Sequence, residues 1–215
     1  MSRDYKWEGK KAFWRGVEVV FTAAEYAWGW FFPDPKIIKG PGAIKQLPAQ
    51  IKADGKKKVL VVTDKVLMSL NLLDGLFEAM KKEGVDYVVY DEVQPNPSIE
   101  NVEAALKLYK DNGCEAIVAV GGGSPMDCAK GVGARVARPT STVKQLGAFV
   151  FMVAIPVTSL PKVTFNGYFP PKLYAVPTTA GTGSETTIAA VITDMQTHDK
   201  FPITDPLIRA NVAVL

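Results

Sequence analysis

The spacing of apolar positions changes near Pro33, and this change divides the chain into two regions. Before it, apolar residues recur at helical spacing, at Phe13, Val17, Val20, Phe21, Ala24 and Trp28. After it, short apolar runs of strand type alternate with longer segments of helical periodicity. The pattern predicts an amphipathic, aromatic-rich N-terminal helix over residues 1–32, followed by an α/β domain over residues 33–215.

The second region is predicted to form a Rossmann-like parallel sheet with flanking helices. Its strand-like runs are 36–39, 58–63, 87–90, 116–120 and 173–176, and its helical segments are 44–51, 72–83, 99–111, a helix after residue 124, and 185–191. The runs 58–63 and 116–120 are continuously apolar, as expected for strands covered on both faces. Ligands of such sheets bind at the carboxyl ends of the strands. The segment 147–172 fits this scheme poorly, and we interpret it as an extra hairpin or a poorly ordered insertion.

Charges within the N-terminal region argue against a membrane-spanning or secretory segment. Arg15, Glu18 and Glu25 interrupt its apolar residues, and charges are costly in a bilayer. We expect residues 12–32 to pack on the body of the protein or on a second subunit, giving a homo-oligomer. Contact with a membrane surface is the less favoured alternative.

Composition excludes several classes of protein. The net charge of +3 comes from 25 basic and 22 acidic residues that form no dense basic block, so we expect no nucleic-acid partner. Two cysteines, Cys114 and Cys128, are too few for a disulfide framework and favour free buried thiols in the cytoplasm. One histidine, His198, cannot form a multi-histidine metal site.

The first candidate motif is the run from Gly121 to Asp127, GGGSPMD, directly after the strand 116–120. Glycines let the backbone approach a ligand, and a helix that starts there favours a bound phosphate. Ser124 is predicted as the N-cap, Pro125 as the first helical residue and Asp127 as the capping-box partner. For Asp127, a capping role alone is as good an interpretation as contact with a ligand.

Two further elements strengthen the interpretation as a dinucleotide site. The run 177–187, PTTAGTGSETT, offers Thr178, Thr179 and Thr182 to the sugar and phosphates of a nucleotide. Asp64 follows the strand 58–63, where a carboxylate can accept hydrogen bonds from ribose hydroxyls and repel a 2′-phosphate. This favours NAD over NADP, although an aspartate closing a strand can simply be solvated. The usual G-x-G-x-x-G does not follow that strand, so the phosphate turn lies on a later one.

Asn96 and Lys200 are weaker candidates for ligand contact. Asn96 stands between Pro95 and Pro97, where asparagine is common in turns, and Lys200 lies in a polar segment where lysine is usually solvated.

These motifs, taken in order, resemble the iron-containing (group III) alcohol dehydrogenase family. The resemblance covers residues 35–146 and 173–215, and includes PKIIKGPG at 35–42, VVTD at 61–64, GGGSPMD at 121–127 and PTTAGTGSETT at 177–187. It implies hydride transfer between a small alcohol or aldehyde and NAD(P), next to an Fe²⁺ or Zn²⁺ ion. By resemblance the cofactor contacts are Asp64 at the ribose, Gly122, Gly123 and Ser124 at the pyrophosphate, and Thr178, Thr179, Thr182, Lys200 and Asn96 around the remainder.

In that family one aspartate and three histidines of a following helical domain hold the metal ion, and the sequence up to Leu215 matches none of that domain. We therefore expect this chain to bind the nucleotide without turnover. Two alternatives stay open: a part of a glycerol dehydrogenase or dehydroquinate synthase-like enzyme, and a non-catalytic nucleotide-binding module that dimerises.

Overall fold

The computed structural model describes residues 34–148 and 169–215, and residues 35–215 form one compact unit. The predicted N-terminal helix lies outside the described residues, as does most of the segment 147–172. Within the described ranges, every helix is too short or too polar to cross a bilayer.

The centre of the unit is a six-stranded sheet in the order β1-β8-β5-β4-β2-β3, with every pair parallel. The strands are β1 (Lys36–Ile38), β2 (Lys58–Val62), β3 (Asp86–Tyr90), β4 (Ala116–Gly121), β5 (Lys172–Pro177) and β8 (Val212–Val214). The predicted Rossmann-like parallel sheet is thereby confirmed, and the continuously apolar β2 and β4 are interior strands, each with a neighbour on both sides.

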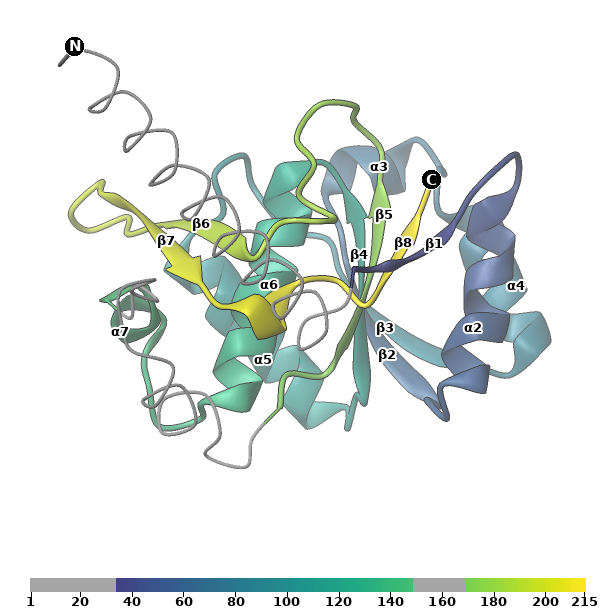
Figure 1. Ribbon diagram of the computed structural model, residues 1–215, viewed down its shortest axis with the longest axis horizontal. Helices are drawn as coiled ribbons and strands as arrows, with labels where there is room; N and C mark the ends of the chain where they lie inside the picture. The colour runs from purple at the N-terminus through teal and green to yellow at the C-terminus, as the bar shows by residue number, and fades with distance from the viewer. Residues whose placement is uncertain (1–33, 149–168) are drawn as a thin grey trace, which may run out of the picture. The chain divides into compact units, whose positions relative to one another are not determined.

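Helices cover both faces of this sheet (Figure 1). Alternate residues of β2 point to opposite faces, so Leu60 and Val62 belong to one apolar core and Val59 and Val61 to the other, all fully buried. The first core contains residues of α5 (Ile99–Asp111) and α6 (Gly123–Ala137). The second contains residues of α2 (Leu47–Ala53), α3 (Lys65–Ser69) and α4 (Asp74–Glu83).

Some predicted elements differ from the structure. The predicted helix 185–191 is wrong: residues 184–186 form a turn, and β6 (Ala189–Thr193) pairs antiparallel with β7 (Lys200–Thr204) as a separate two-stranded sheet. Val191 is exposed while Ala190 and Ile192 are buried, which is the alternation of a half-buried strand. The predicted helix 44–51 is a 3₁₀ turn (Ala43–Gln46) followed by α2, and the predicted helix 72–83 begins only at Asp74.

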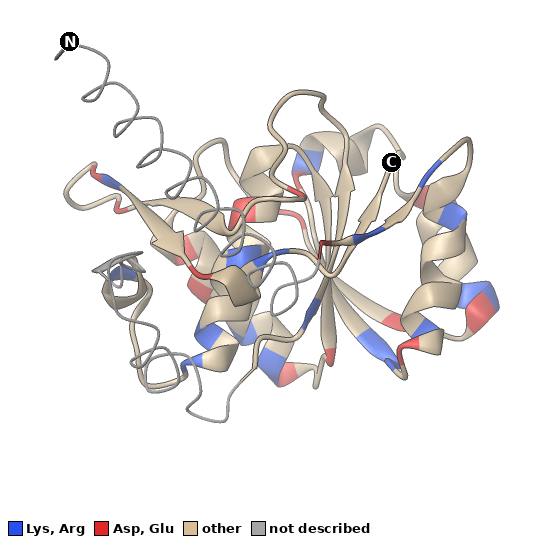
Figure 2. Cartoon of the chain, viewed as in Figure 1, with Lys and Arg blue, Asp and Glu red and all other residues tan. Residues whose placement is uncertain are grey.

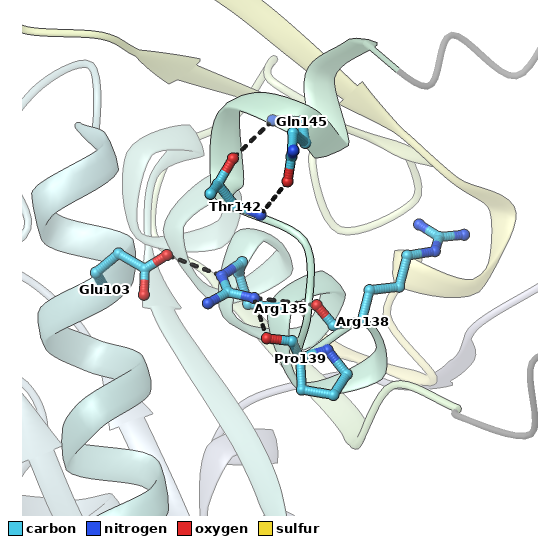
Figure 3. A network of polar contacts seen from close by, with 6 residues as sticks. All are labelled: Glu103, Arg135, Arg138, Pro139, Thr142 and Gln145. Carbon is cyan, nitrogen blue, oxygen red and sulfur yellow. Dashed lines mark hydrogen bonds and ion pairs between the residues drawn. The ribbon is translucent and has the colours of Figure 1, made fainter.

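The end of α6 is fastened by a polar network, drawn in Figure 3. Arg135 Nε donates to Glu103 of α5 at 2.8 Å, and its terminal nitrogen donates to the backbone carbonyls of Arg138 and Pro139 at 3.0 and 3.2 Å. Thr142 and Gln145 then exchange backbone-to-side-chain hydrogen bonds of 2.8 and 3.2 Å at the start of α7 (Val143–Ala148). This capping box starts α7 directly after the turn that Arg135 closes.

Charged residues surround the sheet and are sparse within it. Figure 2 shows lysine, arginine, aspartate and glutamate interspersed on the flanking helices. Within the strands of the large sheet, charges occur only at the first residue, at Lys36, Lys58, Asp86 and Lys172. Of the four charges, three are lysines, so basic side chains lie at the amino ends of the strands, whereas the segments after β2 and β3 begin with Thr63, Asp64, Asp91 and Glu92.

Candidate functional site

The direction in which strands are added to the sheet reverses between β2 and β4. The chain first adds β3 on one side of β2 and then crosses to add β4 on the other side. In open α/β sheets such a reversal leaves a crevice at the carboxyl ends of the two strands. A cavity of about 700 Å³ lies there, lined by Asp64–Leu67, Asp91–Pro95, Asn101, Gly122–Pro125, Thr178 and Thr179. Six of the ten predicted site residues line it: Asp64, Gly122, Gly123, Ser124, Thr178 and Thr179.

The glycine turn at the edge of this cavity leaves no room for a side chain at its first residue. Gly121 has a φ of 147°, and a Cβ there would lie 2.6 Å from Pro125 Cγ, so the fold itself requires a glycine. At Gly123, by contrast, a Cβ would meet nothing closer than Thr182 Cγ2 at 3.8 Å. Gly122 and Gly123 line the cavity and, among the described residues, no side chain caps α6, so its first N–H groups and the helix dipole favour an anion there.

The predicted N-cap is wrong by two residues. Gly122 is the N-cap, α6 begins at Gly123, and no side chain of the described residues caps it. Ser124 lies inside the first turn, and its Oγ accepts a hydrogen bond from the backbone N–H of Asn96 at 3.3 Å. The reason is steric, because the left-handed Gly121 turns the chain early enough for the helix to start at the third glycine.

Ser124, Asn96 and Lys200 come together although they are far apart in sequence. Asn96 has a φ of 59°, which asparagine tolerates better than most residues. Its side-chain oxygen accepts from Lys200 Nζ of β7 at 2.8 Å, and its backbone N–H reaches Ser124. Neither Asn96 nor Lys200 lines the cavity wall; Asn96 bonds to Ser124, which does, and Lys200 is connected to Ser124 only through Asn96.

The second motif joins the first through the sheet. Gly121 pairs with Pro177 in the register of β4 and β5, and Thr178 N donates to Gly121 O at 3.0 Å. The loop that follows brings Thr179 Oγ1 to 3.2 Å from the position that a Cβ on Gly122 would occupy. The two predicted motifs therefore form one surface, with threonine side chains facing the glycine backbone.

Asp127 does not form the predicted capping box. Its carboxylate accepts from Ser184 Oγ and from Val191 N, both at 3.1 Å, so it connects α6 to the loop after β5 and to β6. Burial raises its pKa, an effect that these hydrogen bonds and the nearby Lys130 oppose. Asp127 thus lies behind the second motif, one helical turn into α6 from the glycines.

Lys130 is a buried charge that sequence reasoning missed. The residue is only 1% exposed, and its Nζ donates to Ser184 Oγ, Thr187 Oγ1 and the Ala189 carbonyl. Burial lowers the pKa of Lys130 to about 8, against the opposing effect of Asp127 and Glu185. A lysine in the middle of a helix is usually solvated, so the sequence offers no signal for this contact.

The far end of the cavity is acidic. Asp64 is the N-cap of α3, where its Oδ1 accepts from Leu67 N at 2.9 Å, and it lines the cavity. Asp91 and Glu92, which sequence reasoning did not single out, line the same end after β3. Glu92 forms an exposed ion pair of 3.5 Å with Lys65, and these two charges offset each other. The carboxylates of Asp64 and Asp91 therefore make this end of the cavity negatively charged.

The described residues show no metal centre. They contain no group of three or more histidine, cysteine, aspartate or glutamate side chains that could hold a metal ion. His198 has a φ of 59° between β6 and β7. Cys114 and Cys128 are free and buried, as predicted, and burial raises the pKa of both thiols. The side chains of the described residues therefore do not fit a metal ion.

Comparison with known proteins settles the family. The family model described as iron-containing alcohol dehydrogenase matches residues 34–215. The chain belongs to the iron-containing alcohol dehydrogenase family. Within that family, it is 37% identical over 185 residues to a choline dehydrogenase of Bacillus subtilis (strain 168), covering 86% of this chain and 43% of that protein. It is 35% identical over 185 residues to an NAD-dependent methanol dehydrogenase of Bacillus methanolicus, covering 86% and 45% respectively.

The fold agrees with solved structures of the same family. The crystal structure of a 1,3-propanediol oxidoreductase superposes with a TM-score of 0.71 and 32% identity, over 85% of this chain and 44% of that one. The resemblance to the iron-containing alcohol dehydrogenases, inferred from the motifs, is thereby confirmed. This chain spans less than half the length of the relatives that it matches.

Proposed function

We propose that the described part of the chain binds NAD⁺ in the cavity at the carboxyl ends of β2 and β4, as the cofactor-binding part of an alcohol or aldehyde oxidoreductase. The observation that carries the proposal is the open first turn of α6. Gly122 and Gly123 leave the N–H groups of that turn accessible at a topological switch point, which suits a pyrophosphate. The relative described as an NAD-dependent methanol dehydrogenase supports the same cofactor.

The charges of the cavity favour NAD⁺ over NADP⁺. A 2′-phosphate on the adenosine ribose would stand near Asp64 and Asp91, whose negative charges repel it. The ammonium group nearest in sequence, that of Lys65, is paired with Glu92 at 3.5 Å. The ribose hydroxyls of NAD⁺, in contrast, can donate to the carboxylate of Asp64.

Within this proposal the predicted residues fall into groups with different roles in binding the cofactor. Gly122, Gly123 and Ser124 bind the pyrophosphate through the backbone, and Thr178, Thr179 and Thr182 close over it. Asn96 and Lys200 support Ser124 from the side. Asp127 serves the cofactor indirectly, because its carboxylate is already engaged by Ser184 and Val191.

Hydride transfer to or from an alcohol needs, besides the nicotinamide, a group that polarises the oxygen of the substrate. The described residues supply the dinucleotide site and no cluster of metal ligands. We therefore propose that they bind the cofactor without catalysing turnover by themselves, and that the substrate is a small alcohol or aldehyde.

Titration calorimetry of the full chain with NAD⁺ and with NADP⁺ tests the proposal. We expect saturable binding of NAD⁺ and binding of NADP⁺ that is weaker by about tenfold or more, which corresponds to about 1.4 kcal/mol. Absence of saturable NAD⁺ binding would overturn the assignment, and equal affinities would overturn the role given to Asp64.

A further inference from the structure

The loop between β5 and β6, residues 178–188, is fastened to α6 by two charged side chains that lie three residues apart. Ser184 is shared between them: its hydroxyl donates to Asp127 Oδ1 at 3.1 Å and accepts from Lys130 Nζ at 3.3 Å. Lys130 Nζ also donates to Thr187 Oγ1 at 2.7 Å and to the Ala189 carbonyl at 2.9 Å. All three hydrogens of the ammonium group are therefore used.

The partners of Lys130 are unusual for a buried charge. Its three acceptors are neutral oxygens, and no carboxylate of the described residues pairs with it directly. Burying an ammonium group in this way is costly, and an apolar side chain of similar length would fill the same space at lower cost. The ammonium group adds orientation, because it fixes two points of the loop, Ser184 and Thr187, relative to the first residue of β6, Ala189.

The loop so held is the one that faces the glycine turn. Its first residue is fixed by the hydrogen bond from Thr178 N to Gly121 O. Its last residues are fixed by Lys130, and between the two anchors lie Gly181 and Gly183, both with positive φ. Such glycines restrict the backbone little, so the placement of the threonines between the anchors depends on both ends of the loop.

We propose that Lys130 is a positioning residue for dinucleotide binding, holding the 178–188 loop over the glycine turn without touching the cofactor itself. The inference rests on the proposed binding of NAD⁺ at this turn. It differs from that proposal because it concerns a side chain that lies beneath the loop and does not line the cavity.

If Lys130 holds the loop, the affinity for NAD⁺ should depend on the protonation state of its amine. Burial lowers the pKa of Lys130 to about 8. The charged groups that face it are Asp127 from α6 and Glu185 from the loop, while the loop and β6 otherwise present Ser184, Thr187 and the Ala189 carbonyl. A neutral amine has two hydrogens for three acceptors, so one contact to the loop is lost as the pH rises through this value.

Calorimetric titration with NAD⁺ from about pH 6.5 to 9.5 tests the inference on the full chain. We expect the wild-type dissociation constant to rise by roughly tenfold above pH 8, since a hydrogen bond to a charged group contributes about that much. Lys130→Met should bind weakly at every pH, with a flat profile. Lys81→Met, which removes an exposed lysine of α4, and His198→Gln, which removes the single imidazole, should keep the wild-type profile.

The outcomes separate the two proposals. If the wild-type chain binds no NAD⁺, the proposed function fails and the inference falls with it. If it binds NAD⁺ but Lys130→Met matches it across the pH range, or the wild-type profile is flat, only the role of Lys130 is wrong. Should Lys130→Met fail to fold by far-UV circular dichroism, the wild-type pH profile and Thr187→Val decide the question. Thr187→Val removes the 2.7 Å contact from the loop side and should also weaken binding.

Discussion

Replacing Gly123 by alanine should weaken NAD⁺ binding without lowering the stability of the fold. A Cβ on Gly123 would meet only Thr182 Cγ2 at 3.8 Å and Thr182 Cβ at 4.0 Å, which are ordinary contacts. Gly123 is also the first residue of α6, where alanine is the better helix former by up to about 1 kcal/mol. The added methyl group stands, however, where a pyrophosphate would approach the N–H groups of the turn. Forcing a methyl group into a close contact costs about 1–3 kcal/mol, which corresponds to a loss of NAD⁺ affinity of roughly 5- to 150-fold.

The assay compares Gly123→Ala with Gly133→Ala, the same substitution further along α6. At Gly133 a Cβ would meet Pro170 Cβ at 3.8 Å, again an ordinary contact. Urea unfolding should show both variants as stable as the wild type or slightly more so, and calorimetry should show weakened NAD⁺ binding for Gly123→Ala alone. Unchanged affinity of Gly123→Ala would refute the placement of the pyrophosphate. If both variants lose NAD⁺ affinity equally, the loss comes from a change in α6 as a whole and not from a contact with the pyrophosphate.

Three further predictions follow from particular contacts. Asp64→Ser keeps a residue that caps helices well while removing the charge, so the ratio of NADP⁺ to NAD⁺ affinity should rise by about tenfold in parallel titrations; an unchanged ratio would contradict the role of the carboxylate. In Lys130 the pKa is lowered from 10.5 to about 8, so between these values the unfolded chain binds a proton that the folded chain does not, and rising pH favours folding. The free energies of unfolding of the wild type and of Lys130→Met are measured in urea at several pH values. Their difference, wild type minus variant, should increase by about 3 kcal/mol from pH 8 to 10.5. A difference that stays constant would mean that the pKa of Lys130 is not lowered by folding. Gly131→Ala places a Cβ 2.9 Å from Val102 Cγ2 between α5 and α6 and should lower the free energy of unfolding, measured in urea, by about 1–3 kcal/mol. Val102→Ala in the same chain should partly restore it, and an unchanged free energy of unfolding would contradict the close contact.

The parts of the fold that were predictable are those where local pattern and final environment agree. β2 and β4 are apolar after their first residue or throughout because both faces of the sheet are covered, so their sequence alone indicates interior strands. Residues 185–191 are different, because β6 exists only through pairing with β7, some ten residues later, and its isolated spacing also suits a helix.

In the candidate site, too, the local motifs are predictable from the sequence and the long-range contacts are not. Glycine and threonine motifs at strand ends were visible in the sequence, since small residues there have few other uses. The contacts of Asp127 and Lys130 with Ser184 join residues more than fifty positions apart, and no local pattern encodes them. Ser124 is predicted as a cap, but the turn at Gly121 starts α6 before it, and its hydroxyl then accepts from the N–H of Asn96, a partner that only the tertiary structure supplies.

The position of β8 has a consequence for the order in which the protein can fold. β8 lies between β5 and β1, pairing Val212 with both Tyr174 and Lys36, so among the described strands the first strand of the sheet is attached only through the last. During synthesis β1 leaves the ribosome long before residues 212–214 exist, and until then it has no neighbour in the sheet. Closing this side of the sheet requires a contact across almost the whole unit, which is entropically expensive and slow. The residues that line the nucleotide cavity, by contrast, lie between Asp64 and Thr179, and those that support them extend only to Lys200 of β7, so the binding surface can form before β8 completes the sheet.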